Sequence, residues 1–168
     1  YKYVYLVDAG DHVQGIGYGS MDHGESIVKM MNASEYDFAT LGNHEFDYGM
    51  DGCMNVIDLA QYQYLSCNFY HEKNNERQNH VLKPYVVLDC GDESLAFIGI
   101  TTPETFSKST PKYFQNDKGE FIYGISAGDD GSDLYNDVQA AIDDAKKEGA
   151  TQIVAIGHLG IDSSSTPW

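Results

Sequence analysis

The chain has 168 residues, with 26 Asp and Glu against 10 Lys and Arg, which gives a formal net charge of −16. Hydrophobic residues make up 42% of the sequence, enough for the packed core of one domain. A surface this acidic, with Arg77 as its single arginine, makes nucleic acids and anionic membranes poor candidate partners. No apolar run reaches the roughly 18 residues that a membrane-spanning helix needs.

The first half of the sequence alternates strands and helices. A β-prone run at residues 4–7 leads into a glycine-dense loop at residues 15–24. The apolar spacing that follows predicts a helix over 25–33, a strand over 37–41, a helix over 50–61 and a strand over 64–69.

The second half begins with two apolar runs, 85–88 and 95–100, on either side of a Gly-Asp-Glu turn, which predicts an antiparallel hairpin. Residues 129–148 begin with acidic side chains, carry an apolar stripe and end in two lysines. This charge order complements a helix dipole and predicts a capped amphipathic helix. A buried strand over 153–156 closes the predicted order of elements.

Three cysteines, Cys53, Cys67 and Cys90, are scattered along the chain. They have neither the C-x-x-C spacing of a zinc site nor the density of a disulfide scaffold, so we expect free and mostly buried thiols.

Polar side chains suited to a divalent metal follow three of the predicted strands. Asp11 comes after the first, Asn43 and His44 after the second, and His158 after the last. In an open α/β fold these strand ends face one crevice. Each residue alone would be interpreted as a turn residue, a helix cap or a structural histidine. Their shared position, after short apolar strands and beside glycines, favours a metal site.

Three blocks of the sequence resemble signatures of the calcineurin-like metallophosphoesterases. They are G-D-x-x-x-G at Gly10, G-N-H-E at Gly42 and G-H at Gly157, and they occur in the order of that family. The longer strings D-A-G-D, L-G-N-H-E-F-D-Y-G and G-H-L-G-I-D are similar to the 5′-nucleotidase branch. The resemblance covers nearly the whole chain and implies an α/β sandwich of mixed β-sheets flanked by helices.

The resemblance also implies roles for five residues. Asp11 would bridge two divalent cations, while Asn43 and His158 would bind the second of them. His44 would contact the substrate phosphate, and Asp47 would orient His44 and favour its protonated form. Zinc, manganese, iron and magnesium are candidate cations, and a pair of them clamps both ends of an in-line displacement. Their positive charge makes an acidic protein compatible with a phosphate dianion.

The implied function is that of a dinuclear-metal phosphomonoester hydrolase acting on nucleoside 5′-phosphates. The same domain type also serves 2′,3′-cyclic nucleotide phosphodiesterases and nucleotide-sugar or sulfur-ester hydrolases. A non-catalytic interaction domain is the alternative from another class, and loss of Asn43 or His44 would have favoured it. The family's usual location implies a periplasmic, cell-surface or secreted protein.

Two further family blocks are absent, because the 168 residues contain no Asp-x-His and no Gly-His-x-His after His158. We therefore expect residues 1–168 to be a partial metallophosphoesterase domain that begins inside a fold. It would lack the family's first strand, its last metal block and the C-terminal domain that holds the nucleoside. Alone, the chain is expected to be inactive.

Other features favour ordinary structural interpretations. The G-x-G-x-G run at Gly15 lacks the spacing of a dinucleotide-binding loop, and residues 129–133 lack the spacing of a calcium loop. His12 is either a neighbour of the metal site or an exposed loop residue. The other histidines expected on the surface are His23, His71 and His80.

Overall fold

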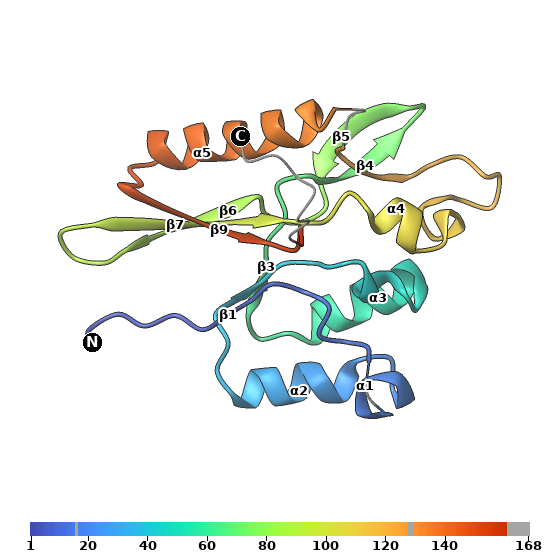
Figure 1. The fold of residues 1–168 in the computed structure, drawn as a ribbon, viewed down its shortest axis with the longest axis horizontal. Coiled ribbons are helices and arrows are strands. Elements are labelled where there is room, and N and C mark those ends of the chain that lie inside the picture. Colours follow the sequence, from blue (N-terminus) through green and yellow to red (C-terminus); the bar gives the residue numbers. More distant parts are fainter. Residues whose placement is uncertain (16, 128–129, 161–168) are drawn as a thin grey trace.

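The computed structural model describes residues 1–15, 17–127 and 130–160. Asp129, the first residue of the predicted acidic helix, lies outside these ranges, and so do Ile161 and Asp162 of the G-H-L-G-I-D string. Figure 1 shows four layers, in which two β-sheets lie between helices. This arrangement confirms the predicted α/β sandwich of mixed sheets.

The first sheet consists of three short parallel strands in the order β1 (Val7–Asp8), β2 (Phe38–Ala39) and β3 (Gln63–Tyr64). Helices α2 (Glu25–Ala33) and α3 (Gly49–Leu59) connect the strands and cover one face of the sheet (Figure 1). Apolar side chains at helical spacing on both helices are buried in one core cluster with the sheet, among them Val28, Met31, Cys53 and Val56.

The second sheet has the order β6 (Tyr85–Asp89), β7 (Ser94–Ile100) and β9 (Gln152–Gly157). Strands β6 and β7 form the predicted antiparallel hairpin, and β9 pairs with β7 in parallel. Helix α5 (Ser132–Lys147) covers the outer face of this sheet (Figure 1).

Successive side chains of β7 point to opposite faces of the second sheet and so contact the layers on both sides. Ile98 packs on the α5 side, whereas its neighbour Phe97 stacks on Phe38 of the first sheet, with ring centroids 5.0 Å apart. Gly99 points the same way as Phe97, and a Cβ there would lie 2.0 Å from the main-chain oxygen of Leu65. The glycine therefore lets the chain segments of the two sheets approach closely.

A third, antiparallel sheet of strands β4 (Phe69–Lys73), β5 (Glu76–His80) and β8 (Tyr123–Ile125) has the order β5-β4-β8. Its hairpin turns at Asn74 and Asn75, whose φ angles of 55° and 61° suit a tight two-residue turn. The remaining elements are short helices: α1 (Gly17–Met21), η1 (His44–Phe46), α4 (Thr105–Lys108) and η2 (Pro111–Phe114).

The single strand predicted over residues 64–69 is wrong, because β3 ends at Tyr64 and β4 begins at Phe69. Between them the chain passes from the first sheet to the second: the N–H of Cys67 donates to the oxygen of Gly99. The side chain of Asn68 bonds both main-chain groups of Thr101 there. These hydrogen bonds hold residues 65–68 in place of the regular pairing of a continuous strand.

Two other predictions are corrected at the N-terminal end. The strand predicted over residues 4–7 is only Val7–Asp8, because the N–H of Leu6 bonds the Asp37 carboxylate instead of a neighbouring strand. The glycine-dense loop contains the short helix α1. Within the described ranges, none of the helices combines the length and the apolar character needed to cross a membrane.

Candidate metal centre

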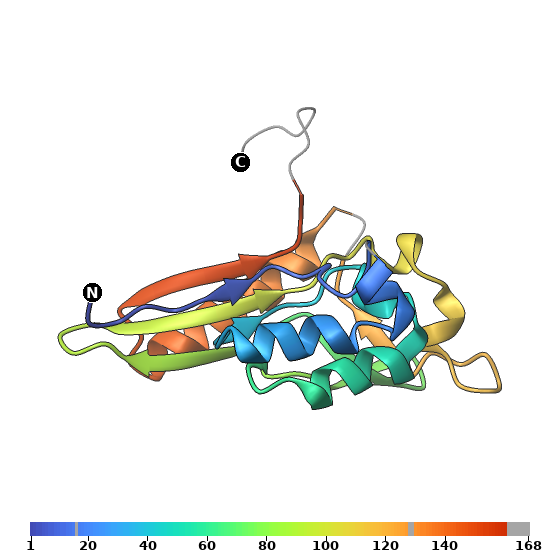
Figure 2. The ribbon, with the colours of Figure 1, turned by 90° about the horizontal axis from the view of Figure 1, so that it is seen from below.

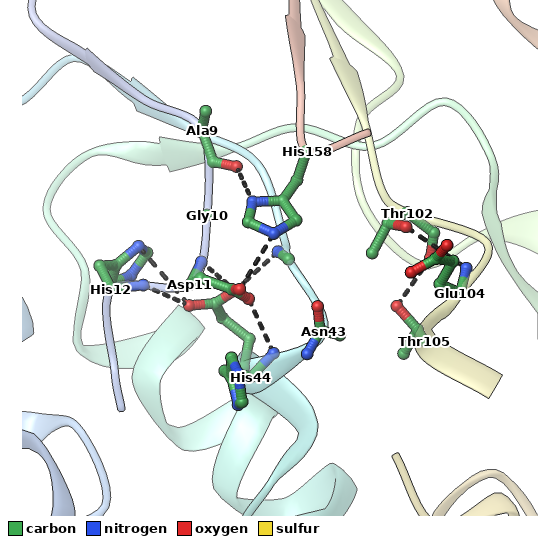
Figure 3. Close-up of polar contacts among 12 residues, drawn as sticks. Ala9, Gly10, Asp11, His12, Asn43, His44, Thr102, Glu104, Thr105 and His158 are labelled. Atoms are coloured by element: carbon green, nitrogen blue, oxygen red, sulfur yellow. Dashed lines mark hydrogen bonds and ion pairs between the residues drawn. The ribbon is translucent and has the colours of Figure 1, made fainter. Parts of the chain in front are cut away.

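The predicted ligands lie at the carboxyl ends of three strands that run in the same direction. Strands β1 and β2 pair in parallel, and the arrows of β1 and β9 point the same way in Figure 2. Figure 3 shows the side chains of Asp11, Asn43, His44 and His158 gathered beyond these ends. The Nε2 of His158 lies 2.9 Å from the Oδ2 of Asp11. The fold thus brings together residues that are far apart in the sequence.

Asp11 sits in a strained and crowded loop. Its φ angle is 65°, in the left-handed region that Asp tolerates better than most residues, and Gly10 before it has φ 91°. A Cβ on Gly10 would lie 2.3 Å from the nitrogen of Gly42, and a Cβ on Gly42 would lie 2.1 Å from the Oδ1 of Asp11. Both glycines are therefore required because the loops after β1 and β2 touch each other.

Hydrogen bonds fix the orientation of the two side chains. The N–H of His44 donates to the Oδ1 of Asp11 at 2.8 Å, so Oδ2 faces His158. The Nδ1 of His158 lies 2.9 Å from the carbonyl oxygen of Ala9 and donates to it, so in the neutral ring Nε2 carries the lone pair. A lone pair facing a carboxylate oxygen at 2.9 Å is favourable only with a proton or a cation between them. This donor pair therefore fits a divalent metal.

His44 and Asp47 form a second pair at the mouth of the site. The Nδ1 of His44 lies 2.7 Å from the Oδ2 of Asp47, and both side chains are partly exposed. The hydrogen bond to Asp47 raises the pKa of His44, more than the opposing effect of partial burial lowers it. The pair therefore presents a ring that is biased towards its cationic form.

Two residues to which the sequence analysis gave no defined role support this site. Glu45 is 1% exposed and accepts three main-chain N–H bonds, and it already stands in the G-N-H-E block. The side chain of His12 is 8% exposed, with Nδ1 2.8 Å from Asp8 and Nε2 2.6 Å from the hydroxyl of Tyr64. The alternative of an exposed loop histidine at position 12 is therefore wrong.

Burial and the neighbouring carboxylates shift the pKa of His12 in opposite directions. Burial lowers its pKa, but the hydrogen bond to Asp8 and the charge of Glu45 outweigh this, so the pKa of His12 is raised. The three other histidines discussed above are exposed, as predicted: His23, His71 and His80.

In the part of the chain that the structure describes, no three His, Cys, Asp or Glu side chains form a group that could hold a metal ion. A metal ion held by Asp11 and His158 would therefore need further ligands, for which the side-chain amide of Asn43 is a candidate. The main-chain oxygen of Asn43 accepts a hydrogen bond from the hydroxyl of Ser109 at 3.0 Å. The turn from Thr102 to Thr105 lies beside Asn43 in Figure 3.

Curated relatives match almost the whole chain, although no protein-family model does. The human 5′-nucleotidase is 32% identical over 161 residues, which are 95% of this chain and 26% of that protein. A snake venom 5′-nucleotidase from Crotalus adamanteus is 31% identical over 163 residues, 95% of this chain and 25% of the relative. Over nearly its whole length the chain is thus similar to 5′-nucleotidases. It spans about a quarter of the length of these relatives.

Solved structures of several hydrolases have a similar fold over nearly the whole chain. The NAD nucleotidase of Haemophilus influenzae has a TM-score of 0.74 at 26% identity, over 95% of this chain and 26% of its own. A calcineurin-like phosphoesterase from Bacillus subtilis has a TM-score of 0.74 at 24% identity, with coverages of 97% and 50%. A sulfate thiohydrolase from Thermus thermophilus reaches 0.74 at 20% identity, with coverages of 93% and 26%. The similarity to the Bacillus subtilis and Thermus thermophilus proteins, at 24% and 20% identity, concerns the fold alone.

Proposed function

We propose that residues 1–168 form part of a phosphomonoester hydrolase that uses two divalent cations to act on nucleoside 5′-phosphates. The observation that carries the proposal is the convergence of Asp11 and His158, 2.9 Å apart, beside the pair formed by His44 and Asp47. The similarity to proteins named 5′-nucleotidase supports the same substrate class.

In this proposal Asp11 would contribute to holding both cations, and Asn43 and His158 would hold the second. The first cation needs further ligands, which we assign to the family's Asp-x-His and Gly-His-x-His blocks outside residues 1–168. A further domain would hold the nucleoside. That the chain spans only a quarter of its relatives supports this division.

Bound cations of this type supply Lewis-acid charge and lower the pKa of a water molecule towards roughly 7. The chain's own residues then orient the substrate. The ring of His44, held at Nδ1 by Asp47, donates from Nε2 to a phosphoryl oxygen and stabilises the charge that develops there. Asp47 keeps the imidazole in the orientation that allows this donation.

Other substrates remain outcomes of the test. The likeness to a sulfate thiohydrolase concerns the fold alone, so no observation favours a sulfur ester, a cyclic nucleotide or a nucleotide sugar over a 5′-phosphate. We also propose a location outside the cytoplasm, which the names of the snake venom relatives support.

The test measures phosphate release from adenosine 5′-monophosphate with added Mn²⁺, using the protein that carries residues 1–168 together with the remaining blocks. Asp11→Ala should abolish hydrolysis, because only a carboxylate can bridge and neutralise both cations. Asp92→Ala, in the exposed β6–β7 turn, serves as the matched control. A panel with 2′,3′-cyclic AMP, a nucleotide sugar and a sulfate ester distinguishes the substrate classes.

Two results would refute the proposal: no hydrolysis of any nucleoside 5′-phosphate by the parent, or full activity of the Asp11 variant. Residues 1–168 alone should release negligible phosphate, because one incomplete site neither holds two ions nor positions the nucleoside. Equal rates for the chain and its parent would show that the ligands are not where we assign them.

A further inference from the structure

Glu45 is a carboxylate buried directly beneath the candidate metal centre. It lies in the short helix η1 after β2 and is only 1% exposed. An isolated charge at such a position is strongly unfavourable unless hydrogen bonds compensate for the lost water. The environment of Glu45 therefore has to supply several donors.

Three main-chain N–H groups supply them. Oε2 of Glu45 accepts from Asp11 at 2.8 Å and from Gly42 at 2.6 Å, and Oε1 accepts from His12 at 2.9 Å. The Nδ1 of His12 lies 3.6 Å from the same Oε1. We use the name first loop for residues 9–13 and second loop for residues 40–44. One carboxylate thus ties the first loop to the second.

These bonds act on the residues proposed as metal ligands. Asp11 has an unfavourable φ of 65°, and its N–H points at Glu45 while its own Oδ1 accepts from the N–H of His44. Held at both ends, the Asp11 side chain presents Oδ2 to His158. Gly42, whose N–H also donates to Glu45, directly precedes Asn43 in the sequence. The Glu45 carboxylate therefore restrains the second loop as well.

We propose that Glu45 is a positioning residue, which holds the first and second loops so that Asp11 and Asn43 bind the same cation. The inference rests on the proposed function, since it assumes that these two residues are ligands. Glu45 is too buried to touch a substrate, so it acts through the loops and takes no part in the reaction itself.

The variant Glu45→Gln tests this with almost no change in shape. A Gln side chain offers one carbonyl oxygen, which can keep two N–H bonds, but its NH₂ group must then face a third N–H donor. Glu45→Asp keeps the charge but is one methylene shorter, so it cannot reach all three donors. The matched control is Ile98→Val, a mild truncation of a fully buried side chain on β7 outside both loops.

Two readouts are measured on the protein that carries residues 1–168. Titration calorimetry gives Mn²⁺ affinity, which should fall about 10- to 100-fold in Glu45→Gln, the range for losing a group that orients a metal ligand. Hydrogen–deuterium exchange of peptides covering the two loops should rise at least tenfold. Glu45→Asp should lie between Glu45→Gln and the wild type in both readouts, and Ile98→Val should change neither.

Wild-type Mn²⁺ affinity together with wild-type loop exchange in Glu45→Gln would overturn the inference. If the wild type itself binds no Mn²⁺, the proposed function fails, but loop exchange still decides whether Glu45 holds the loops. If Glu45→Gln does not fold, the decision rests on Glu45→Asp and on the wild type. Rapid exchange of the Asp11, His12 and Gly42 amides in the wild type would contradict the hydrogen bonds on which the inference depends.

Discussion

Replacing Gly42 by Ala places one methyl group between the two loops of the metal centre. An ideal Cβ at this position would lie 2.1 Å from the Oδ1 of Asp11 and 2.7 Å from its Cγ. Because Cβ atoms essentially never approach other atoms closer than 3.0 Å, the Asp11 carboxylate has to move by about 1 Å. Its φ of 65° and the bond from the N–H of His44 leave it little freedom to do so.

The displacement has two measurable costs. Overpacking of a tight site lowers the free energy of unfolding by about 1–3 kcal/mol. A shift of about 1 Å also breaks the 2.9 Å approach of Asp11 to His158, and misplacement on that scale reduces turnover by about 10²-fold. Mn²⁺ affinity should fall as well, because the Asp11 oxygen moves away from the nitrogen that we assign to the same cation.

The assay compares Gly42→Ala with Gly17→Ala. Gly17 begins α1, and a Cβ there would meet no atom within 4 Å, so the control adds the same methyl group without a clash. Titration calorimetry with Mn²⁺, phosphate release from AMP and thermal unfolding are measured for both variants in the protein that carries residues 1–168 together with the remaining blocks. Affinity and turnover of Gly42→Ala within twofold of the control would show that the loops are not packed as the structure describes.

Three other predictions concern the site and the core. His44→Asn should keep Mn²⁺ content near that of the wild type in metal analysis, yet slow AMP hydrolysis by about 10² to 10⁴-fold, because it removes a positioned donor; loss of metal would instead make His44 a ligand. Gly99→Ala should lower the free energy of unfolding by about 3 kcal/mol and Tm by about 6–12 °C in calorimetry, since its Cβ would lie 2.0 Å from a main-chain oxygen. In native protein, Ellman's reagent should modify Cys90 first, because burial raises the pKa of Cys67 to about 12 and that of Cys53 further; fast labelling of Cys53 before unfolding would contradict the packing of α3.

The elements that the sequence predicted are those with a local pattern. Helix α2 has the predicted bounds because its apolar side chains recur with the helical period. The β6–β7 hairpin follows from two apolar runs around a turn. In contrast, all residues of β5 are exposed and carry no alternation, so its pairing with β4 leaves no signal in the sequence. In β8, Gly124 lies under the ring of Tyr70, a contact that only the tertiary fold creates.

The candidate site also contains residues that the sequence predicted and contacts that it did not. Asp11, Asn43 and His158 were predictable because each follows a strand beside a glycine, and the family resemblance supplied their roles. Whether these residues bind metal stays a prediction. The interaction of Glu45 with Asp11 was not predictable, because its donors lie 33 and 34 residues away in another loop. Such contacts depend on how two loops dock, which the spacing within either block does not encode.

The charge of the whole chain and the charge of the site have different consequences for binding. The charge of −16 is spread along the whole chain, and α5, which lies beyond the second sheet in Figure 1, holds four Asp and two Lys of it. At physiological ionic strength, exposed charges separated by more than about 8 Å are largely screened from each other. Close to the site, Glu45 is compensated by N–H groups, and Asp47 is paired with His44. Two divalent cations there would add four positive charges. The acidic composition therefore counts against polyanions, which need a long basic surface, but not against a phosphate monoester that touches only this centre.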